Sequence, residues 1–295
     1  MAASVFIVFS IASPYFFSLG NIFSIIQQST INLVIAIGMT FVIASGGIDL
    51  SVGSVVGLSS VIMADLIKNY EIPIVLGVLV AFIIGVSSGV LNGFLIGKVK
   101  LQPFIVTLAS ATYLRGLALV YTGGRPIYTL PSKYVSIFAG KVINIPVMVL
   151  WALAITLIGI FILKKTKLGE YSLAIGGNEE AVRICGVNIV KYKIFIYGIS
   201  GILSTLAALM LAARLNAAEP ASGSGYELAA IAAVVMGGTP LSGGKANIIG
   251  TVMGALILGM LINGLTLMNI PSFYQQVVTG LVILLAVILD KKRTQ

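Results

Sequence analysis

The chain has 295 residues, of which 58% are hydrophobic and only 9% are charged. Soluble domains carry about a quarter charged residues, and a chain of this length has no core large enough to hide so much apolar surface from water. The composition therefore excludes an ordinary soluble protein and predicts a polytopic membrane protein. The net charge of +9 is expected from basic residues in cytoplasmic loops, so we predict no nucleic-acid partner.

The residue types that are missing narrow the function further. The sequence has no histidine, and its one cysteine is Cys185. This excludes histidine-based catalysis, histidine-ligated metal sites and an intrachain disulfide. The nearest approach to a nucleotide-binding loop, GGTPLSGGKA at 237–246, has Thr239 in place of its first glycine and Ala246 in place of its final Ser or Thr. No nucleophile and base pair is visible, so we predict no catalytic residue, metal or cofactor.

Ten apolar stretches are candidates for membrane-spanning helices, because about 20 residues cross the hydrocarbon layer. They lie near 1–17, 29–45, 51–67, 73–97, 103–121, 145–163, 194–214, 226–238, 247–267 and 271–289. The first, third and eighth are short or flanked by polar residues, so the expected number of spans is eight to ten. The prediction is an all-α membrane bundle that forms a single domain over residues 1–295.

The distribution of Lys and Arg predicts the orientation. With ten spans and the basic C-terminus (DKKRTQ) inside, twelve of the 18 Lys and Arg residues fall in inner regions and five in outer loops. Arg115 is the remaining one and lies within a span. Because basic residues collect on the cytoplasmic side, both termini are expected inside the cell.

Two glycine-rich turns echo each other. Residues 42–53 read VIASGGIDLSVG, and residues 233–244 read AVVMGGTPLSGG. The echo is either a chance similarity of Gly- and Ser-rich turns or a repeated membrane unit with broken helices at corresponding places, as in many transporters. The second interpretation makes four glycines candidates for gating: Gly46, Gly47, Gly237 and Gly238.

Five polar residues in or beside the spans are further candidates for gating or for lining a pore. Asp49 and Ser51 either cap the helix that follows the first turn or take part in gating. Arg115 either reaches the outer surface, pairs inside the bundle or lines a pore. Asn92 and Asn263 either bond across helices or line a polar path. Other side chains whose donors and acceptors suit the hydroxyl groups of a solute are Gln27, Gln28, Thr107, Ser110, Tyr113, Gln275 and Gln276, although no spacing selects them.

A row of glycines occupies one face of the fourth candidate span. Gly85, Gly89, Gly93 and Gly97 recur at four-residue spacing. The row predicts that another helix approaches this face closely.

One segment in the predicted cytoplasmic loop 164–193 looks like a short water-soluble helix. Asn178 is a good N-cap, Glu179 and Glu180 suit the first turn, and Arg183 suits the last. Gly186 predicts the left-handed stop. A helix of about two turns is marginal alone, so it either packs on its own chain or seats in a groove of a soluble partner.

From Ile43 onward the chain resembles the inner-membrane permeases of bacterial ABC importers for ribose, xylose and galactose, and most closely the ribose permeases. The matching stretches are SGGIDLSVGS (45–54), TLASATYLRGLALVYTGG (107–124), LGEYSLAIGGNEEAVRICGVNIVKYK (168–193), GSGYELAAIAAVVMGGTPLSGGKANIIGTVMGALILG (223–259) and QQVVTGLVILLAVILDKK (275–292).

The resemblance implies a multi-pass permease in the bacterial cytoplasmic membrane, surrounded by lipid. It implies a cytoplasmic ABC ATPase, an extracytoplasmic sugar-binding protein and a second permease copy as partners, and ribose is the sugar it leads us to expect. It also implies that the short helix is the coupling helix that contacts the ATPase. The residues carried over to this role are Gly177, Asn178, Glu179, Glu180, Ala181, Arg183, Gly186 and Asn188.

Two departures from the family pattern stand out. Ala229 occupies a position where these permeases often have Asp, and the chain starts in what looks like the middle of a span. The alternative function is an ion-coupled secondary transporter of a small polar solute. It needs an acid within the membrane, and Asp49 is the acid that keeps this alternative open. A membrane enzyme or assembly factor is a more distant alternative.

Overall fold

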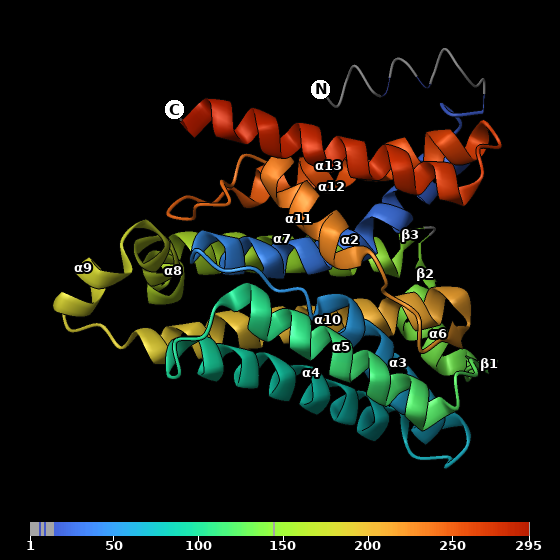
Figure 1. Ribbon diagram of the computed structural model, residues 1–295. Coiled ribbons are helices and arrows are strands. Elements are labelled where there is room, and N and C mark those ends of the chain that lie inside the picture. Colours follow the sequence, from blue (N-terminus) through green and yellow to red (C-terminus); the bar gives the residue numbers. More distant parts are fainter. Residues whose placement is uncertain (1–5, 7–8, 10–14, 144, 295) are drawn as a thin grey trace.

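The computed structural model describes residues 6, 9, 15–143 and 145–294 as a bundle of long helices (Figure 1). The helices are α2 (Leu19–Ala44), α3 (Val52–Lys68), α4 (Ile74–Gly97), α5 (Pro103–Thr122), α6 (Ser132–Ala139), α7 (Val147–Lys165), α8 (Lys167–Gly177), α9 (Glu179–Ile184), α10 (Ile189–Leu215), α11 (Tyr226–Met236), α12 (Ile248–Leu267) and α13 (Ser272–Thr294). The short strands are β1 (Ile127–Tyr128), β2 (Lys141–Val142), β3 (Ile145–Pro146) and β4 (Ala217–Ala218).

The helices confirm the predicted all-α membrane bundle. Among the described residues, α2, α4, α5, α7, α10 and α12 are long and apolar enough to cross a membrane. The shorter α3 and α11 coincide with the third and eighth candidate stretches, and α13 coincides with the last. The first candidate stretch, 1–17, lies almost entirely outside the described residues.

Helix α2 begins ten residues earlier than predicted. Its N-cap is Ser18, whose Oγ accepts a hydrogen bond from the backbone N–H of Asn21 at 3.3 Å. The added turns contain the polar residues Asn21, Gln27 and Gln28. They are tolerated because much of α2 packs against other helices rather than facing lipid.

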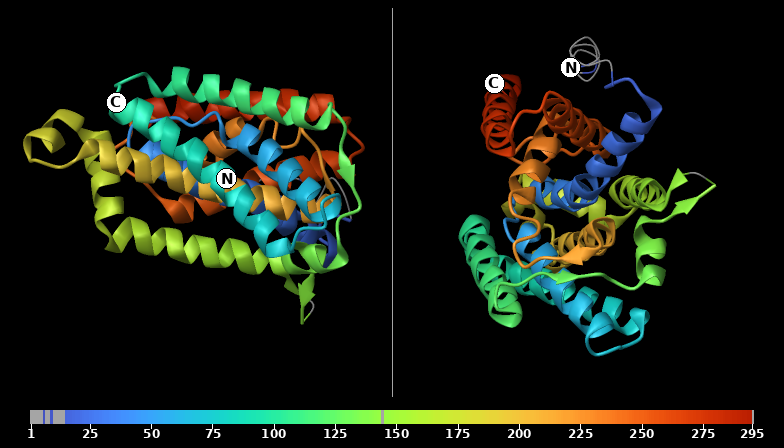
Figure 2. Two further views of the ribbon diagram at one scale, coloured as in Figure 1. Left: turned by 90° about the horizontal axis from the view of Figure 1, so that it is seen from below. Right: turned by 90° about the vertical axis from the view of Figure 1, so that its right-hand side faces the viewer.

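Two central helices carry the core. Most of α10 and more than half of α2 are buried, whereas α4, α5 and α7 leave most of their apolar surface exposed. Figure 2 shows α4 and α5 on the outside of the bundle, with α2 and α10 inside it. This division fits a membrane protein, in which peripheral helices face hydrocarbon and central ones face protein.

The glycine row of α4 packs directly on α10, as the spacing predicts. A Cβ at Gly89 would overlap the carbonyl oxygen of Tyr197, and a Cβ at Gly93 would lie 2.6 Å from the Cα of Ile194. The same close approach holds at Gly85. Small residues therefore let the two backbones meet, which is how helices gain packing contacts in a membrane.

The two ends of the bundle differ. One end carries α8 and α9, which project beyond the long helices (Figure 1). We call it the α9 end. The opposite end carries α6 and the small strands, and there β1 pairs antiparallel with β4. Tyr134 of α6 anchors this end, because its buried hydroxyl donates to the carbonyl of Leu209 at 2.7 Å.

Candidate functional site

The two predicted helix breaks are present. Helix α2 ends at Ala44 and α3 begins at Val52, while α11 ends at Met236 and α12 begins at Ile248. Figure 1 shows the first link leaving the α9 end and running back along the bundle before α3 begins. In each break, one glycine of the pair has a left-handed backbone conformation, and the other allows a neighbouring group to pack closely against the backbone.

The glycine roles are reversed between the two breaks. In the first, Gly46 has a φ of +74° and a Cβ at Gly47 would overlap the hydroxyl of Tyr197. In the second, Gly238 has a φ of +86° and a Cβ at Gly237 would overlap the backbone of Gly250. An L-residue is strained at the positive φ of Gly46 and Gly238. At Gly47 and Gly237 any side chain would overlap a neighbour, so all four positions require glycine or a local shift.

The two breaks touch each other. The backbone N–H of Gly244 donates to the carbonyl of Ala44 at 3.0 Å. A Cβ at Gly243 would lie 2.8 Å from the backbone nitrogen of Gly46. The repeated sequences are therefore neighbours in space, which is the arrangement expected of corresponding parts of a repeated unit.

The end of α8 completes this contact. A Cβ at Gly176 would overlap the carbonyl oxygen of Ala44 and lie 2.6 Å from the nitrogen of Gly244, and a Cβ at Gly244 would lie 3.2 Å from the Cα of Gly177. We call this meeting of Ala44–Gly46, Gly176–Gly177 and Gly243–Gly244 the glycine junction. Sequence reasoning missed Gly176, although the Gly176–Gly177 pair just before the N-cap Asn178 was a visible signal.

The short helix forms at the predicted residues. Asn178 accepts a hydrogen bond from the backbone N–H of Ala181 at 2.9 Å, and α9 ends before Gly186, whose φ is +79°. Asn188 in turn caps α10 by accepting from the N–H of Lys191 at 3.0 Å. The local pattern thus determined both ends of α9.

Ion pairs brace α9. Arg183 bonds to Glu179 at 2.9 Å and also to Glu180, and Lys193 bonds to Glu179 at 2.7 Å. Arg183 and the two glutamates are well exposed, so each pair adds little stability. The Lys193–Glu179 pair holds α9 against the start of α10, whereas the two pairs of Arg183 lie within α9.

The outward surface of α9 is open. On its inner side Val182 is buried in a small cluster with Ile175 and Ile189. On its outer side Ile184 is 79% exposed. Gly177, Asn178, Glu180, Ala181, Arg183, Gly186 and Asn188 are also exposed. The predicted contact residues are therefore accessible, and Ile184, which sequence reasoning missed, adds an apolar side chain to them.

A buried polar network joins the first break to three helices. The carboxylate of Asp49 accepts from the N–H of Ser51 at 3.0 Å, from the Ser51 hydroxyl at 2.5 Å and from the Ser200 hydroxyl at 2.7 Å. Asn92 donates to Ser51 Oγ at 3.1 Å and accepts from Ser110 at 2.5 Å. Asp49, Ser51 and Asn92 are thus brought together, and Asn92 bonds across helices.

Arg115 is a clamp between backbone segments. Its guanidinium donates to the carbonyls of Pro220, of Ser222 at 2.8 Å and of Gly53 at 3.1 Å. Gly53 lies in the first turn of α3, and Pro220 and Ser222 lie in the loop before α11. Of the three predicted roles, pairing inside the bundle is the one that these bonds match. The starts of α3 and α11 consequently meet here.

Asn263 also bonds across helices. Its Oδ1 accepts from the side-chain amide of Asn21 at 2.9 Å, which ties α12 to α2. It lies away from the Asp49 network and forms no part of it.

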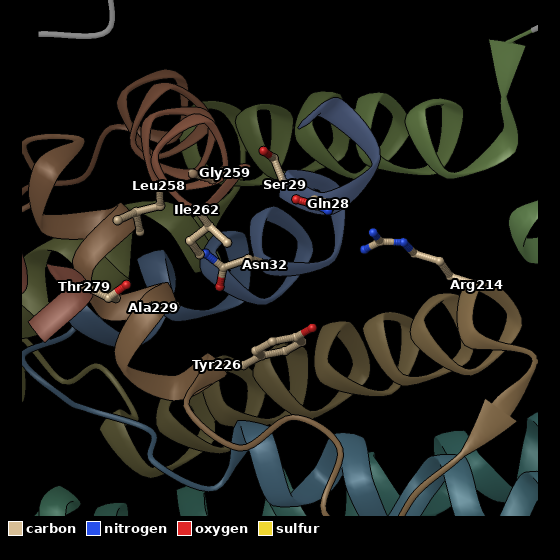
Figure 3. Close-up of a pocket in the computed structure, with 11 residues that line it drawn as sticks. Gln28, Ser29, Asn32, Arg214, Tyr226, Ala229, Leu258, Gly259, Ile262 and Thr279 are labelled. Carbon is tan, nitrogen blue, oxygen red and sulfur yellow. The ribbon is translucent and has the colours of Figure 1, made fainter. Parts of the chain in front are cut away.

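A cavity of about 260 Å³ lies between α2, α10, α11, α12 and α13. Figure 3 shows Arg214 pointing toward Gln28 and Tyr226 lying below Asn32. The polar lining residues are Gln28, Ser29, Asn32, Arg214, Tyr226 and Thr279, and the remaining ones are Ala229, Ala255, Leu258, Gly259 and Ile262. Sequence reasoning had singled out Gln28 alone for its hydroxyl-matching side chain, because no spacing relates the others.

A second cavity of about 470 Å³ adjoins the first. The two share Tyr226, Ala229, Ile262 and Thr279. The second continues to Ser272 and the two glutamines at the start of α13. Ala229, the departure from the family pattern, therefore lies between the two cavities.

Comparisons with known proteins agree with this arrangement. The family model described as branched-chain amino acid transport system / permease component matches residues 21–287. The ribose import permease protein RbsC of Haemophilus influenzae is 47% identical over 286 residues, which cover 95% of this chain and 88% of that protein. The RbsC protein of Bacillus subtilis is 48% identical over 290 residues, or 98% of this chain and 90% of that protein.

A relative named for another sugar matches over the same length. The L-arabinose ABC transporter permease protein AraH of Azospirillum brasilense is 34% identical over 289 residues, which cover 98% of this chain and 85% of that protein. No solved structure matches the chain. The long apolar helices, the paired helix breaks and these matches together place the chain in the family of branched-chain amino acid transport system permease components, among the sugar permeases of ABC importers.

Proposed function

We propose that this chain is the transmembrane permease of an ATP-driven importer that carries a monosaccharide, with ribose as the substrate that its relatives favour. Those named ribose import permease are 43–48% identical to it over nearly their full length, whereas those named for allose and arabinose are 36% and 34% identical. Because identity is higher to the ribose group throughout, ribose is the first sugar to test.

The single observation that carries an ATP-driven mechanism is the exposed α9. It presents Ala181 and Ile184 outward at one end of the bundle, and a short helix of this kind suits a groove of a soluble partner. The partner is a cytoplasmic ABC ATPase, which performs the hydrolysis. The α9 end then faces the cytoplasm, with both termini inside the cell.

The opposite end of the bundle receives the sugar. There the loops near 121–141 and 214–227 would meet an extracytoplasmic sugar-binding protein. A second copy of the permease completes the transporter, and the exposed apolar surfaces of α4, α5 and α7 face membrane lipid or that copy. The protein resides in the bacterial cytoplasmic membrane.

The glycine junction supplies a mechanical connection. When the ATPase pulls on α9, the movement reaches Gly176–Gly177 at the end of α8 and passes from there to both helix breaks, which α8 touches directly. Tight backbone packing transmits displacement, because no flexible side chain intervenes. The breaks, with Gly46, Gly47, Gly237 and Gly238, then act as hinges for gating.

The comparisons give no support to the ion-coupled alternative, and we assign Asp49 a structural role instead. Both carboxylate oxygens of Asp49 accept hydrogen bonds from serines. The acid is therefore engaged in holding the first break to α10, which is a structural task.

Reconstitution tests the proposal. The chain and a candidate ATPase are incorporated into liposomes, and a candidate binding protein is added on the outside. Sugar uptake and ATP hydrolysis are then measured for ribose, xylose, galactose, allose and arabinose in turn. We expect ATP-dependent uptake of one of these sugars, with hydrolysis stimulated by the loaded binding protein. Uptake that follows a proton gradient without ATPase would overturn the proposal.

A further inference from the structure

In the cavity between α2, α10, α11, α12 and α13, the hydroxyls of Ser29 and Thr279 donate to backbone carbonyls, but one buried polar atom lacks a protein partner among the described residues. The side-chain oxygen of Asn32 is buried and has no hydrogen-bond partner in the described part of the chain. Arg214 is an exposed residue at the end of α10 and forms no ion pair with the described residues, so it is the burial of Asn32 that matters here. A buried polar atom without a partner is costly, so it indicates a group that a ligand satisfies.

The chemistry of the lining defines the ligand. The carboxamides of Gln28 and Asn32 each offer donors and an acceptor, Arg214 offers donors only, and the Tyr226 hydroxyl can do both. The described lining residues include a cationic side chain and no carboxylate, which favours a neutral ligand over a cationic one. Groups that donate and accept side by side match neighbouring hydroxyls, while Leu258 and Ile262 present an apolar wall to the C–H face of a ring.

The size agrees with a small ligand. Pockets for drug-sized molecules are about 300–1,000 Å³, and this cavity of about 260 Å³ lies just below that range. The adjoining cavity of about 470 Å³ extends from Tyr226 and Thr279 to Gln276, which gives a hydroxyl-rich molecule a polar route along α13.

The position of the cavity connects it to the moving parts. Tyr226 is the first residue of α11 and Ala229 lies one turn on, and α11 ends at the second helix break. Substrate sites of transporters lie beside interrupted helices of this kind. Any shift of α11 at that break therefore moves Tyr226 relative to Asn32 on α2.

We propose that this cavity is a monosaccharide-binding site within one permease protomer, in which Asn32, Gln28 and Arg214 bond the hydroxyls of a sugar ring that rests on Tyr226. The site holds a neutral sugar in passage and contributes to the choice of sugar. This inference rests on the proposed import of a monosaccharide.

Paired substitutions test the site in the full reconstituted complex. Gln28→Leu and Asn32→Leu remove the amides and keep the side-chain volume. Gln102→Leu is the control, because Gln102 is exposed at the start of α5 and lines neither cavity. We expect the maximal rate of ribose uptake to fall at least about tenfold in the first two variants, with assembly and ATP hydrolysis by the complex retained, and to stay unchanged in the control.

Cysteine labelling gives a second readout that does not depend on transport rate. In a Cys185→Ser background, Ala229→Cys places a thiol in the cavity and Ala221→Cys places one on the exposed loop. With ATP present, saturating ribose is expected to slow labelling of the first thiol by a methanethiosulfonate reagent and to leave the second unaffected.

The outcomes separate this inference from the proposed function. Normal ribose uptake in both leucine variants, or labelling of Ala229→Cys that ribose does not slow, would overturn the cavity as a sugar site while import itself stands. Failure of the unsubstituted complex to import any monosaccharide would overturn both.

Discussion

The backbone N–H of Gly244 bonds to the carbonyl of Ala44 at 3.0 Å, across two segments that lie 200 residues apart. The bond joins the second helix break to the end of α2, and Gly176 at the end of α8 packs against the same two groups. The two helix breaks and the end of α8, which leads into α9, thus contact one another at the glycine junction.

Gly176→Ala should damage this junction. The added Cβ would overlap the carbonyl oxygen of Ala44, and overpacking of this kind costs about 1–3 kcal/mol. We expect a lower thermal unfolding temperature and strongly reduced ATP-driven uptake. Gly116→Ala on α5 is the control, because its Cβ would meet nothing within 4 Å. Uptake at the normal rate by the Gly176 variant would show that the junction does not transmit movement.

The hinges themselves can be tested at Gly47 and Gly238. In Gly47→Val the side chain collides with Tyr197, and in Gly238→Val the positive φ of +86° becomes strained. Both variants are expected to assemble with the ATPase and yet block sugar uptake, as measured by co-purification and by transport in liposomes. Gly20→Val serves as the control, since a Cβ there contacts nothing within 4 Å. Unimpaired transport in both hinge variants would refute a role in gating.

The exposed side of α9 should bind the ATPase. Ala181→Trp adds bulk and Ile184→Asp replaces an apolar contact with a charge, so each should weaken ATPase binding about tenfold or more. Cys185→Ser, a small change beside them, should bind normally. Gly186→Trp is expected to uncouple ATP hydrolysis from sugar uptake, because the φ of +79° at Gly186 favours glycine and a bulky residue would distort the end of α9. Binding is measured in detergent with purified ATPase, and full affinity in the first two variants would place the contact elsewhere.

Asp49 should act as a structural acid. Asp49→Ala leaves the hydroxyls of Ser51 and Ser200 without their acceptor, and charge-assisted bonds of this kind contribute about 1.5–3 kcal/mol each. We expect a clear loss of thermal stability. Ser59→Ala is the matched control, because the buried Ser59 hydroxyl has no partner among the described residues and its removal should be neutral. A protonophore should leave ATP-driven uptake by the unsubstituted protein unchanged; if it abolished uptake with ATP present, ion coupling through Asp49 would return as an explanation.

Arg115 should be irreplaceable by a shorter cation. Arg115→Lys keeps the charge but cannot reach three carbonyls in a planar arrangement, so the loop before α11 should loosen from the start of α3. We expect faster proteolysis within residues 219–225 and reduced uptake. Arg125→Lys, in the exposed loop that follows α5, should change neither measurement, because Arg125 is not one of the clamp residues. Equal protease resistance of the Arg115 variant and the unsubstituted protein would contradict the clamp.

The sequence by itself determined what depends on composition and on near neighbours. The shortage of charge identified the membrane class, and Asn178 with Gly186 set both ends of α9, because a cap and a left-handed stop act within a few residues. The four-residue glycine spacing on α4 predicted a close helix contact, since residues at that spacing share one side of a helix.

Tertiary structure alone decided which distant residues meet. That Ser200 completes the bonds of Asp49, that Gly176 packs on Ala44, and that Arg214 and Tyr226 line one cavity with Asn32 follow from helices brought together from far along the chain. No local spacing encodes such contacts, because they depend on how whole helices are rotated and stacked against each other. Hydropathy was enough to predict the membrane-spanning helices, whereas the polar contacts inside the bundle could be seen only once the helices were packed together.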